Sequence, residues 1–179
     1  MMKKEKNRFW KIWALPAQIG LVFALALPVS SAPEGDAVRG SVTNLPLPRF
    51  VSLKAAEGNV RRGPSLNHRI DWVFRHRDMP LLVTAEFEHW RRVEDAEGQG
   101  GWIYYSLLSG ARTVSVAVDG TALRVRPDPE AQIVAEAKAG VIGRLGECDP
   151  NWCRIAAGST KGWVVKSALW GVAADELRE

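Results

Sequence analysis

The chain has 179 residues, of which 46% are hydrophobic and 25% charged, and its formal net charge is +4. The excess charge lies in residues 1–31, whose removal takes away five of the 24 basic and one of the 20 acidic residues and leaves 19 of each. The remaining chain is neutral, which excludes a whole-chain attraction to nucleic acid or another polyanion. Its length suits one ordinary domain or two small ones.

Residues 1–31 have the three parts of an export signal. Five cations precede an apolar run centred on residues 21–27, and Pro28 with small residues ends that run. This order is typical of a cleaved secretory signal peptide. The alternative is an uncleaved membrane anchor, but a spanning helix needs about 20 apolar residues, and Pro16 interrupts this run. We therefore predict a periplasmic or secreted protein that meets a membrane only during export.

Residues 32–49 have the composition of a linker. Gly, Pro, Asp, Ser and Asn are frequent there, and no hydrophobic periodicity is present. Pro46 and Pro48 favour extended backbone. The sequence therefore predicts a flexible linker over 32–49.

The rest of the chain repeats itself at a nearly fixed offset. Trp90 and Trp152 are 62 residues apart, and Trp102 and Trp163 are 61 residues apart. A small drift in the offset is what loop deletions produce in a duplicated domain. The repeat divides the chain into a first unit, a second unit and a polar tail, at residues 50–111, 112–172 and 173–179.

Both units have the pattern of small all-β barrels. Short alternating segments follow one another closely, with Gly and Pro turns between them, and no segment has sustained helical periodicity. Residues 81–87 and 90–94 predict a hairpin, and residues 106–110 a single helical turn. Residues 133–137 fit either a strand or a helix, and their place in the repeat favours a strand.

This pattern resembles the bacterial SH3-like (SH3b) domains of exported proteins, in their tandem periplasmic form. In the first unit the resemblance lies in residues 59–65, 72–74, 81–87, 90–93, 101–103 and 106–110. In the second unit it lies in residues 147–154, 162–163 and 169–171. It implies two SH3-like barrels and binding of cell-wall peptide or peptidoglycan. Such domains often accompany a catalytic module, and no hydrolase module is found in this sequence.

The two cysteines, Cys148 and Cys153, are separated by four residues. In an exported protein an even pair this close indicates a disulfide. The alternative is a zinc site, which needs four ligands, but the three histidines all lie in the first unit. The sequence therefore predicts a structural disulfide and no metal.

Catalytic motifs are not found in the sequence. It contains no Gly-x-Ser-x-Gly elbow, phosphate-binding Gly loop or His-Glu-x-x-His pattern. His68 with Asp71, or Glu86 with Glu88, are conceivable acid–base pairs, but carboxylates on a small barrel are usually solvated surface groups. We predict that the chain is not an enzyme and uses no cofactor.

The tryptophans fall into two classes. The repeated pairs Trp90/Trp152 and Trp102/Trp163 are first explained as barrel core, because a small barrel needs large side chains to fill it, although ligand contact is the alternative. Aromatic residues without a full repeat mate are free to form a binding wall. These residues are Trp72, Phe74, Tyr104, Tyr105 and Trp170.

Arg61 and Arg62 precede the Gly-Pro turn of the first unit and have two interpretations. Either they bind a peptide carboxylate, or they form an ion pair with Asp71 or Glu86. Together with Trp72, Phe74, Tyr104 and Tyr105 they are the candidate ligand-binding residues.

The sequence predicts a binding module for peptidoglycan stem peptide or another extended peptide of the cell envelope. The alternative is a protein–protein assembly module of the envelope that does not bind the wall.

Overall fold

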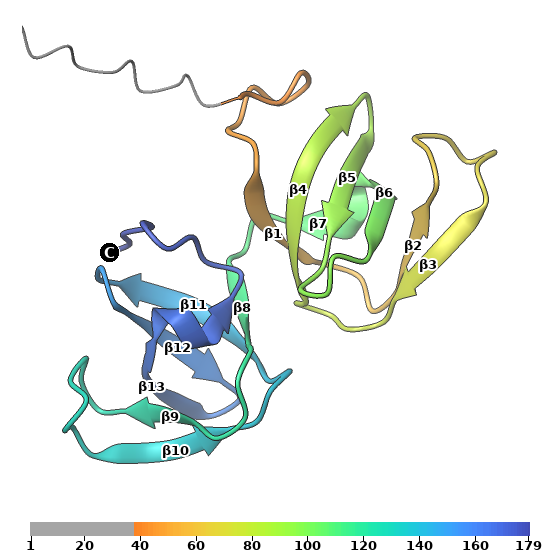
Figure 1. The fold of residues 1–179 in the computed structure, drawn as a ribbon. Helices are drawn as coiled ribbons and strands as arrows, with labels where there is room; N and C mark the ends of the chain where they lie inside the picture. The colour runs from red at the N-terminus through yellow and green to blue at the C-terminus, as the bar shows by residue number, and fades with distance from the viewer. Residues whose placement is uncertain (1–37) are drawn as a thin grey trace, which may run out of the picture. The chain divides into compact units, whose positions relative to one another are not determined.

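The computed structural model describes residues 38–179, which form two seven-stranded antiparallel sheets (Figure 1). The first sheet has the strand order β3-β2-β6-β5-β4-β1-β7. Its strands are β1 (Arg49–Leu53), β2 (Gly58–Arg61), β3 (Ile70–Phe74), β4 (Pro80–Phe87), β5 (Trp90–Glu94), β6 (Gly100–Tyr104) and β7 (Leu108–Ser109). A 3-10 turn, η1 (Tyr105–Leu107), precedes β7. The first sheet is called barrel 1 below.

The second sheet, barrel 2, repeats this arrangement with the order β10-β9-β13-β12-β11-β8-β14. Its strands are β8 (Thr113–Val116), β9 (Thr121–Arg124), β10 (Ile133–Ala137), β11 (Ile142–Cys148), β12 (Trp152–Ala157), β13 (Thr160–Val165) and β14 (Leu169–Trp170). A 3-10 turn, η2 (Lys166–Ala168), precedes β14. The predicted all-β tandem is confirmed, and so is the strand at 133–137.

The predicted signal at residues 1–31 lies outside the described residues. Within residues 38–179, no helix is long and apolar enough to cross a bilayer.

The core of barrel 1 is built mainly from aliphatic side chains on the inner faces of its strands. Val93 on β5 and Ile103 on β6 are fully buried, and their strand neighbours alternate with them towards the outer face, as the two-residue period of a strand requires. Phe74, at the end of β3, is 2% exposed and packs in this core. Its prediction as a ligand-binding residue is therefore wrong, because the pleat of β3 points it inward.

Three of the four repeated tryptophans, Trp102, Trp152 and Trp163, are only half-buried, so the core prediction is wrong for them, whereas Trp90 is buried. Both core clusters lack tryptophan among the described residues. Trp102 lies directly opposite Arg92 on one side and Arg61 on the other. Barrel 2 repeats this cross-strand arrangement of one tryptophan between two arginines. The repeat therefore places Trp102 and Trp163 on the outer face, where they are half-buried.

The β4–β5 and β11–β12 hairpins differ at one equivalent position. Glu86 pairs in register with Arg91, and Cys148 pairs in register with Cys153. The first pair is an ion pair, with 3.5 Å between Arg91 Nε and Glu86 Oε1. The second is a disulfide, as predicted, across residues whose Cα atoms are 4.1 Å apart. One hairpin position thus carries an ionic contact in barrel 1 and a covalent one in barrel 2.

The segments before barrel 1 and after barrel 2 also form hydrogen bonds or ion pairs with the folded chain. The sequence places residues 32–49 in a flexible linker, but from residue 38 onward they form a turn against barrel 1, with 2.8 Å between Gly40 N and Leu45 O. The C-terminal tail pairs with barrel 2, where Cys148 and Arg178 exchange two backbone hydrogen bonds. Glu176 forms an ion pair of 2.7 Å with Arg112. The predicted linker and polar tail therefore extend the folded part of the chain.

Removal of the disulfide is expected to cost little stability. The bond closes a loop with only four intervening residues, so it restricts the unfolded chain weakly, and the loop-length relation gives about 2 kcal/mol. We expect the double variant Cys148→Ala, Cys153→Ala to lose about this much free energy of unfolding in urea. Treatment of the natural protein with a thiol reductant is the matched control. A loss beyond ~4 kcal/mol in both would show that barrel 2 depends on the bond for folding.

Candidate functional site

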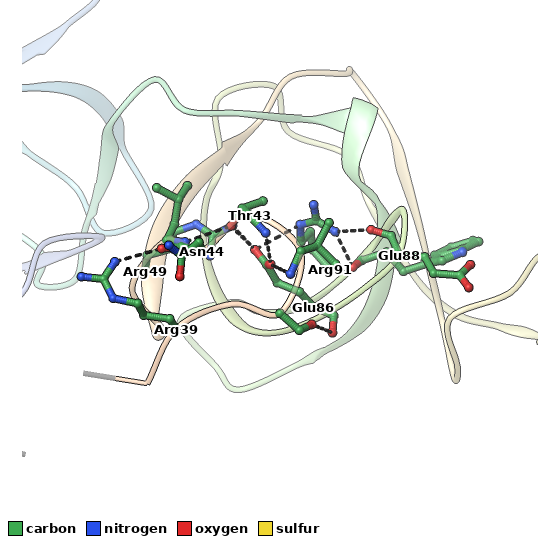
Figure 2. A network of polar contacts seen from close by, with 11 residues as sticks. Arg39, Thr43, Asn44, Arg49, Glu86, Glu88 and Arg91 are labelled. Carbon is green, nitrogen blue, oxygen red and sulfur yellow. Dashed lines mark hydrogen bonds and ion pairs between the residues drawn. The ribbon is translucent and has the colours of Figure 1, made fainter. Parts of the chain in front are cut away.

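The carboxylate of Glu86 is the centre of a polar network at one end of barrel 1, shown in Figure 2. Its side chain has no exposed surface. Oε2 accepts hydrogen bonds from the backbone N–H groups of Val42 (3.0 Å) and Thr43 (2.8 Å), and Oε1 accepts from the Thr43 hydroxyl (2.7 Å). Arg49 Nη2 lies 2.6 Å from Oε1. Glu86 therefore joins the N-terminal turn, β1 and the β4–β5 hairpin.

The pKa of Glu86 reflects two opposed effects. Burial raises it, because a charge is disfavoured away from water. The hydrogen bonds from Thr43, Arg49 and Val42 lower it more, so that the pKa falls from 4.5 to about 2. Glu86 is therefore an anion near neutral pH. Its donors occupy it fully, so it serves the structure and is not available as a general acid or base.

Aromatic rings gather beside this network on β5, β6 and η1. The ring centroids of Tyr104 and Tyr105 are 5.3 Å apart, and the His89 ring lies 5.8 Å and 5.6 Å from them. Trp90 meets Tyr104 edge to face at 5.5 Å and is buried, whereas Tyr104 is 37% and Tyr105 48% exposed. We call His89, Tyr104 and Tyr105 the tyrosine surface. It offers rings that stay half-exposed above a buried tryptophan.

A pocket adjoins the tyrosine surface at Tyr105. It has a volume of about 360 Å³ and opens between the N-terminal turn, β1 and the segment that follows η1. Arg49 and Arg91 line its polar side, and Phe50 and Leu108 line its apolar side. The Arg91 guanidinium carbon lies 6.0 Å from the centre of the Tyr105 ring. The pocket and the tyrosine surface therefore share Tyr105 as a common wall.

The two predicted arginines stabilise the loop between β2 and β3. Arg61 Nη1 donates to the backbone oxygens of Leu66 (3.0 Å) and His68 (2.7 Å). Arg62 Nε lies 3.1 Å from Asp71 Oδ2, which confirms the ion-pair interpretation for this residue. Arg61 does not form the expected ion pair among the described residues, since its partners there are carbonyl groups. A role of either arginine in ligand binding stays a prediction.

Trp72 is 45% exposed on β3, at the edge of the sheet, and is paired with Val60 of β2. The ring contacts of the described residues do not join it to the tyrosine surface. Of the six predicted ligand residues, the structure thus brings together Tyr104 and Tyr105. His89, Arg49 and Arg91 belong beside them and were not predicted.

The strand order and repeat agree with one protein family. The family model for the bacterial SH3 domain matches residues 54–110 and again residues 117–171. The chain belongs to the bacterial SH3 domain family. Barrels 1 and 2 are thus its first and second SH3 domains.

No curated protein matches the chain. Two solved structures of NlpC proteins from Trichomonas vaginalis show weak similarity. NlpC2 has a TM-score of 0.32 and 14% identity over 69% of this chain, and NlpC1 has 0.31 and 13% over 73%. The chain spans 48% of the length of each. Similarity of this degree carries no argument about function.

The second SH3 domain does not repeat the tyrosine surface. Trp152 pairs with Val165 where Trp90 pairs with Tyr104. The next residue is Lys166, which is buried and donates from Nζ to the backbone oxygens of Ala174 (3.3 Å) and Glu176 (2.8 Å) of the tail. The counterpart of Tyr104 is therefore an aliphatic residue, Val165, which is 39% exposed, and the counterpart of Tyr105 is a lysine bonded to the chain's own tail.

Proposed function

We propose that the protein is a non-catalytic binding module whose first SH3 domain holds an extended peptide of the cell wall, the peptidoglycan stem peptide, on the tyrosine surface. The observation that carries this proposal is the pair of half-exposed tyrosines beside His89, above buried Trp90. Flat aromatic side chains bind extended peptides with little loss of conformational freedom. Bacterial SH3 domains in general bind peptides or cell-wall components.

The proposed compartment is the periplasm or the cell exterior, where the wall is accessible. The charged and apolar pattern of residues 1–31 supports it. The Cys148–Cys153 disulfide supports it too, because such bonds persist mainly in oxidising compartments.

Sedimentation with purified sacculi tests the proposal. We expect the protein to pellet with sacculi and to release no soluble muropeptide from them. The double variant Tyr104→Ala, Tyr105→Ala is expected to remain in the supernatant, with its secondary structure unchanged, because the contact area on the tyrosine surface is lost. Soluble muropeptides should change the tryptophan fluorescence of the natural protein, since Trp90 lies against Tyr104.

The control is Val165→Ala, which changes the residue of the second SH3 domain that corresponds to Tyr104 and should leave sedimentation unchanged. Reduced sedimentation of the variant Trp72→Ala would show that the ligand also contacts β3. A natural protein that stays in the supernatant and shows no fluorescence change would contradict the proposal. Release of muropeptides would contradict its non-catalytic part.

The alternative function is a protein–protein assembly module of the envelope, and exposed apolar side chains on the β2–β3 hairpin favour it. Leu66 is 72%, Ile70 44% and Trp72 45% exposed. Capture of one envelope protein by crosslinking, lost in Trp72→Ala and without sacculus binding, would support this alternative.

A further inference from the structure

The pocket beside Tyr105 contains an excess of positive charge. Arg49 and Arg91 both line it, and both face the same single carboxylate, that of Glu86, at 2.6 Å and 3.5 Å. Two guanidinium groups and one carboxylate leave a net charge of +1. Because the pKa of Glu86 is about 2, this balance holds throughout the neutral range.

Glu86 has little remaining capacity to satisfy the two arginines. Its oxygens already accept from Val42, Thr43 and the Thr43 hydroxyl as well as from Arg49. Arg91 Nη1 donates to the backbone oxygens of Glu88 (2.9 Å) and Trp90 (2.8 Å). The other terminal nitrogen, Nη2, makes no hydrogen bond to any described residue. The hairpin backbone thus holds the Arg91 guanidinium in place, and its Nη2 atom can still donate hydrogen bonds to a ligand.

Arg49 also has a hydrogen-bond donor without an acceptor. Its Nη1 atom is buried and has no acceptor among residues 38–179. Buried polar groups are almost always hydrogen-bonded. Because Arg49 is one of the residues that line the pocket, its unpaired nitrogen is donor capacity beside the pocket for an anionic acceptor. Guanidinium groups bind carboxylates through short, charge-assisted hydrogen bonds.

The remaining walls define the size and polarity of the bound group. Phe50 and Leu108 form an apolar side, and the pocket volume of about 360 Å³ is at the small end of the range for ligand sites. A carboxylate attached to a small aliphatic side chain fits this combination. Tyr105 connects the pocket to the tyrosine surface, so one peptide can reach both.

We propose that the pocket of Arg49, Arg91 and Tyr105 binds the free C-terminal carboxylate of a short peptide whose preceding residues lie on the tyrosine surface. This inference rests on the proposed function, and it adds a direction and a chemical requirement to it: the peptide end is a free acid with a small side chain. The second SH3 domain lacks the site, because Cys148 and Cys153 occupy the positions of Glu86 and Arg91.

Two forms of one ligand test the inference without changing the protein. The probes are a soluble muropeptide that ends in a free alanine carboxylate and the same compound with that carboxylate converted to the amide. Calorimetric titration of the full chain is expected to give an affinity for the amide that is weaker by about tenfold or more, because charge-assisted hydrogen bonds are lost. Sodium chloride should weaken binding of the acid more than that of the amide.

A variant provides the second measurement. Arg49→Lys keeps a cation beside Glu86 but removes the guanidinium nitrogen that has no acceptor. We expect it to keep the fold and to reduce the preference for the acid over the amide. Equal affinities of the natural protein for acid and amide would overturn the carboxylate site and leave the proposed function standing. Failure of both compounds to bind would overturn the proposed function, and the inference with it.

Discussion

Replacement of Glu86 by Gln is expected to lower the free energy of unfolding at pH 7 by about 3 to 5 kcal/mol, the usual cost of removing one partner of a buried ion pair. Gln has almost the shape of Glu, so packing is retained, but Arg49 and Arg91 lose their only shared carboxylate. The amide also presents an N–H₂ group to the donors of Thr43. Urea denaturation followed by far-ultraviolet circular dichroism measures the effect.

The low pKa of Glu86 also predicts how the free energy of unfolding depends on pH. Its folded-state pKa of about 2 lies below 4.5, so the carboxylate stabilises the fold fully above about pH 4.5, and this contribution is lost as the pH falls towards 2. The shift corresponds to about 3 kcal/mol. Glu86→Gln should therefore flatten the pH dependence of stability in this window.

Glu88→Gln is the matched control, because the Glu88 side chain is exposed in the turn of the same hairpin and only its backbone oxygen is used. It should leave stability within about 0.5 kcal/mol of the natural protein. If both variants had equal stability at pH 7, the Glu86 network would not hold the N-terminal turn on barrel 1.

Gly100→Ala is expected to destabilise barrel 1 by about 3 kcal/mol, at the upper end of the usual cost of overpacking. A Cβ at this position would lie 1.9 Å from the backbone oxygen of Val93 and 2.8 Å from its carbonyl carbon. The neighbouring atoms belong to the β5 backbone, so the strand itself would have to move. Amide hydrogen exchange should show loss of protection in β5 and β6.

Gly110→Ala is the control for this substitution. A Cβ there meets no atom within 4 Å, and Gly110 is not among the glycines with positive φ. Its stability should stay within about 0.5 kcal/mol of the natural protein. Unchanged protection of β5 in Gly100→Ala would contradict the packing argument.

The fold was predictable because the repeat and the strand pattern carry the same information. Trp90 and Trp152 occupy the same register position opposite β6 and β13, so a fixed offset in the sequence became a fixed place in two sheets. Their inside or outside placement was not predictable from that offset. Bulges shift the side-chain alternation, as between Val83 and Ala85 on β4, and sequence alone does not locate them.

The site was only partly predictable for a related reason. Tyr104 and Tyr105 were identified because barrel 2 has no aromatic residue at either position. Arg49 lay in the predicted linker, and its partner Glu86 follows it by 37 residues. A contact between a linker-like segment and a strand end leaves no local pattern. Only the low Gly and Pro content after Pro48 could have suggested that the barrel begins at Arg49.

The two hairpin contacts make the SH3 domains sensitive to different reagents. Protons can weaken the Glu86 contact and leave Cys148–Cys153 intact, whereas electrons from a thiol can cleave the disulfide and leave Glu86 ionised. Each domain can thus be loosened in the presence of its undisturbed neighbour. One polypeptide therefore contains both an ionic and a covalent contact at equivalent positions of two hairpins. The stabilisation that each contact provides can be measured in the same protein, with the other domain as the reference.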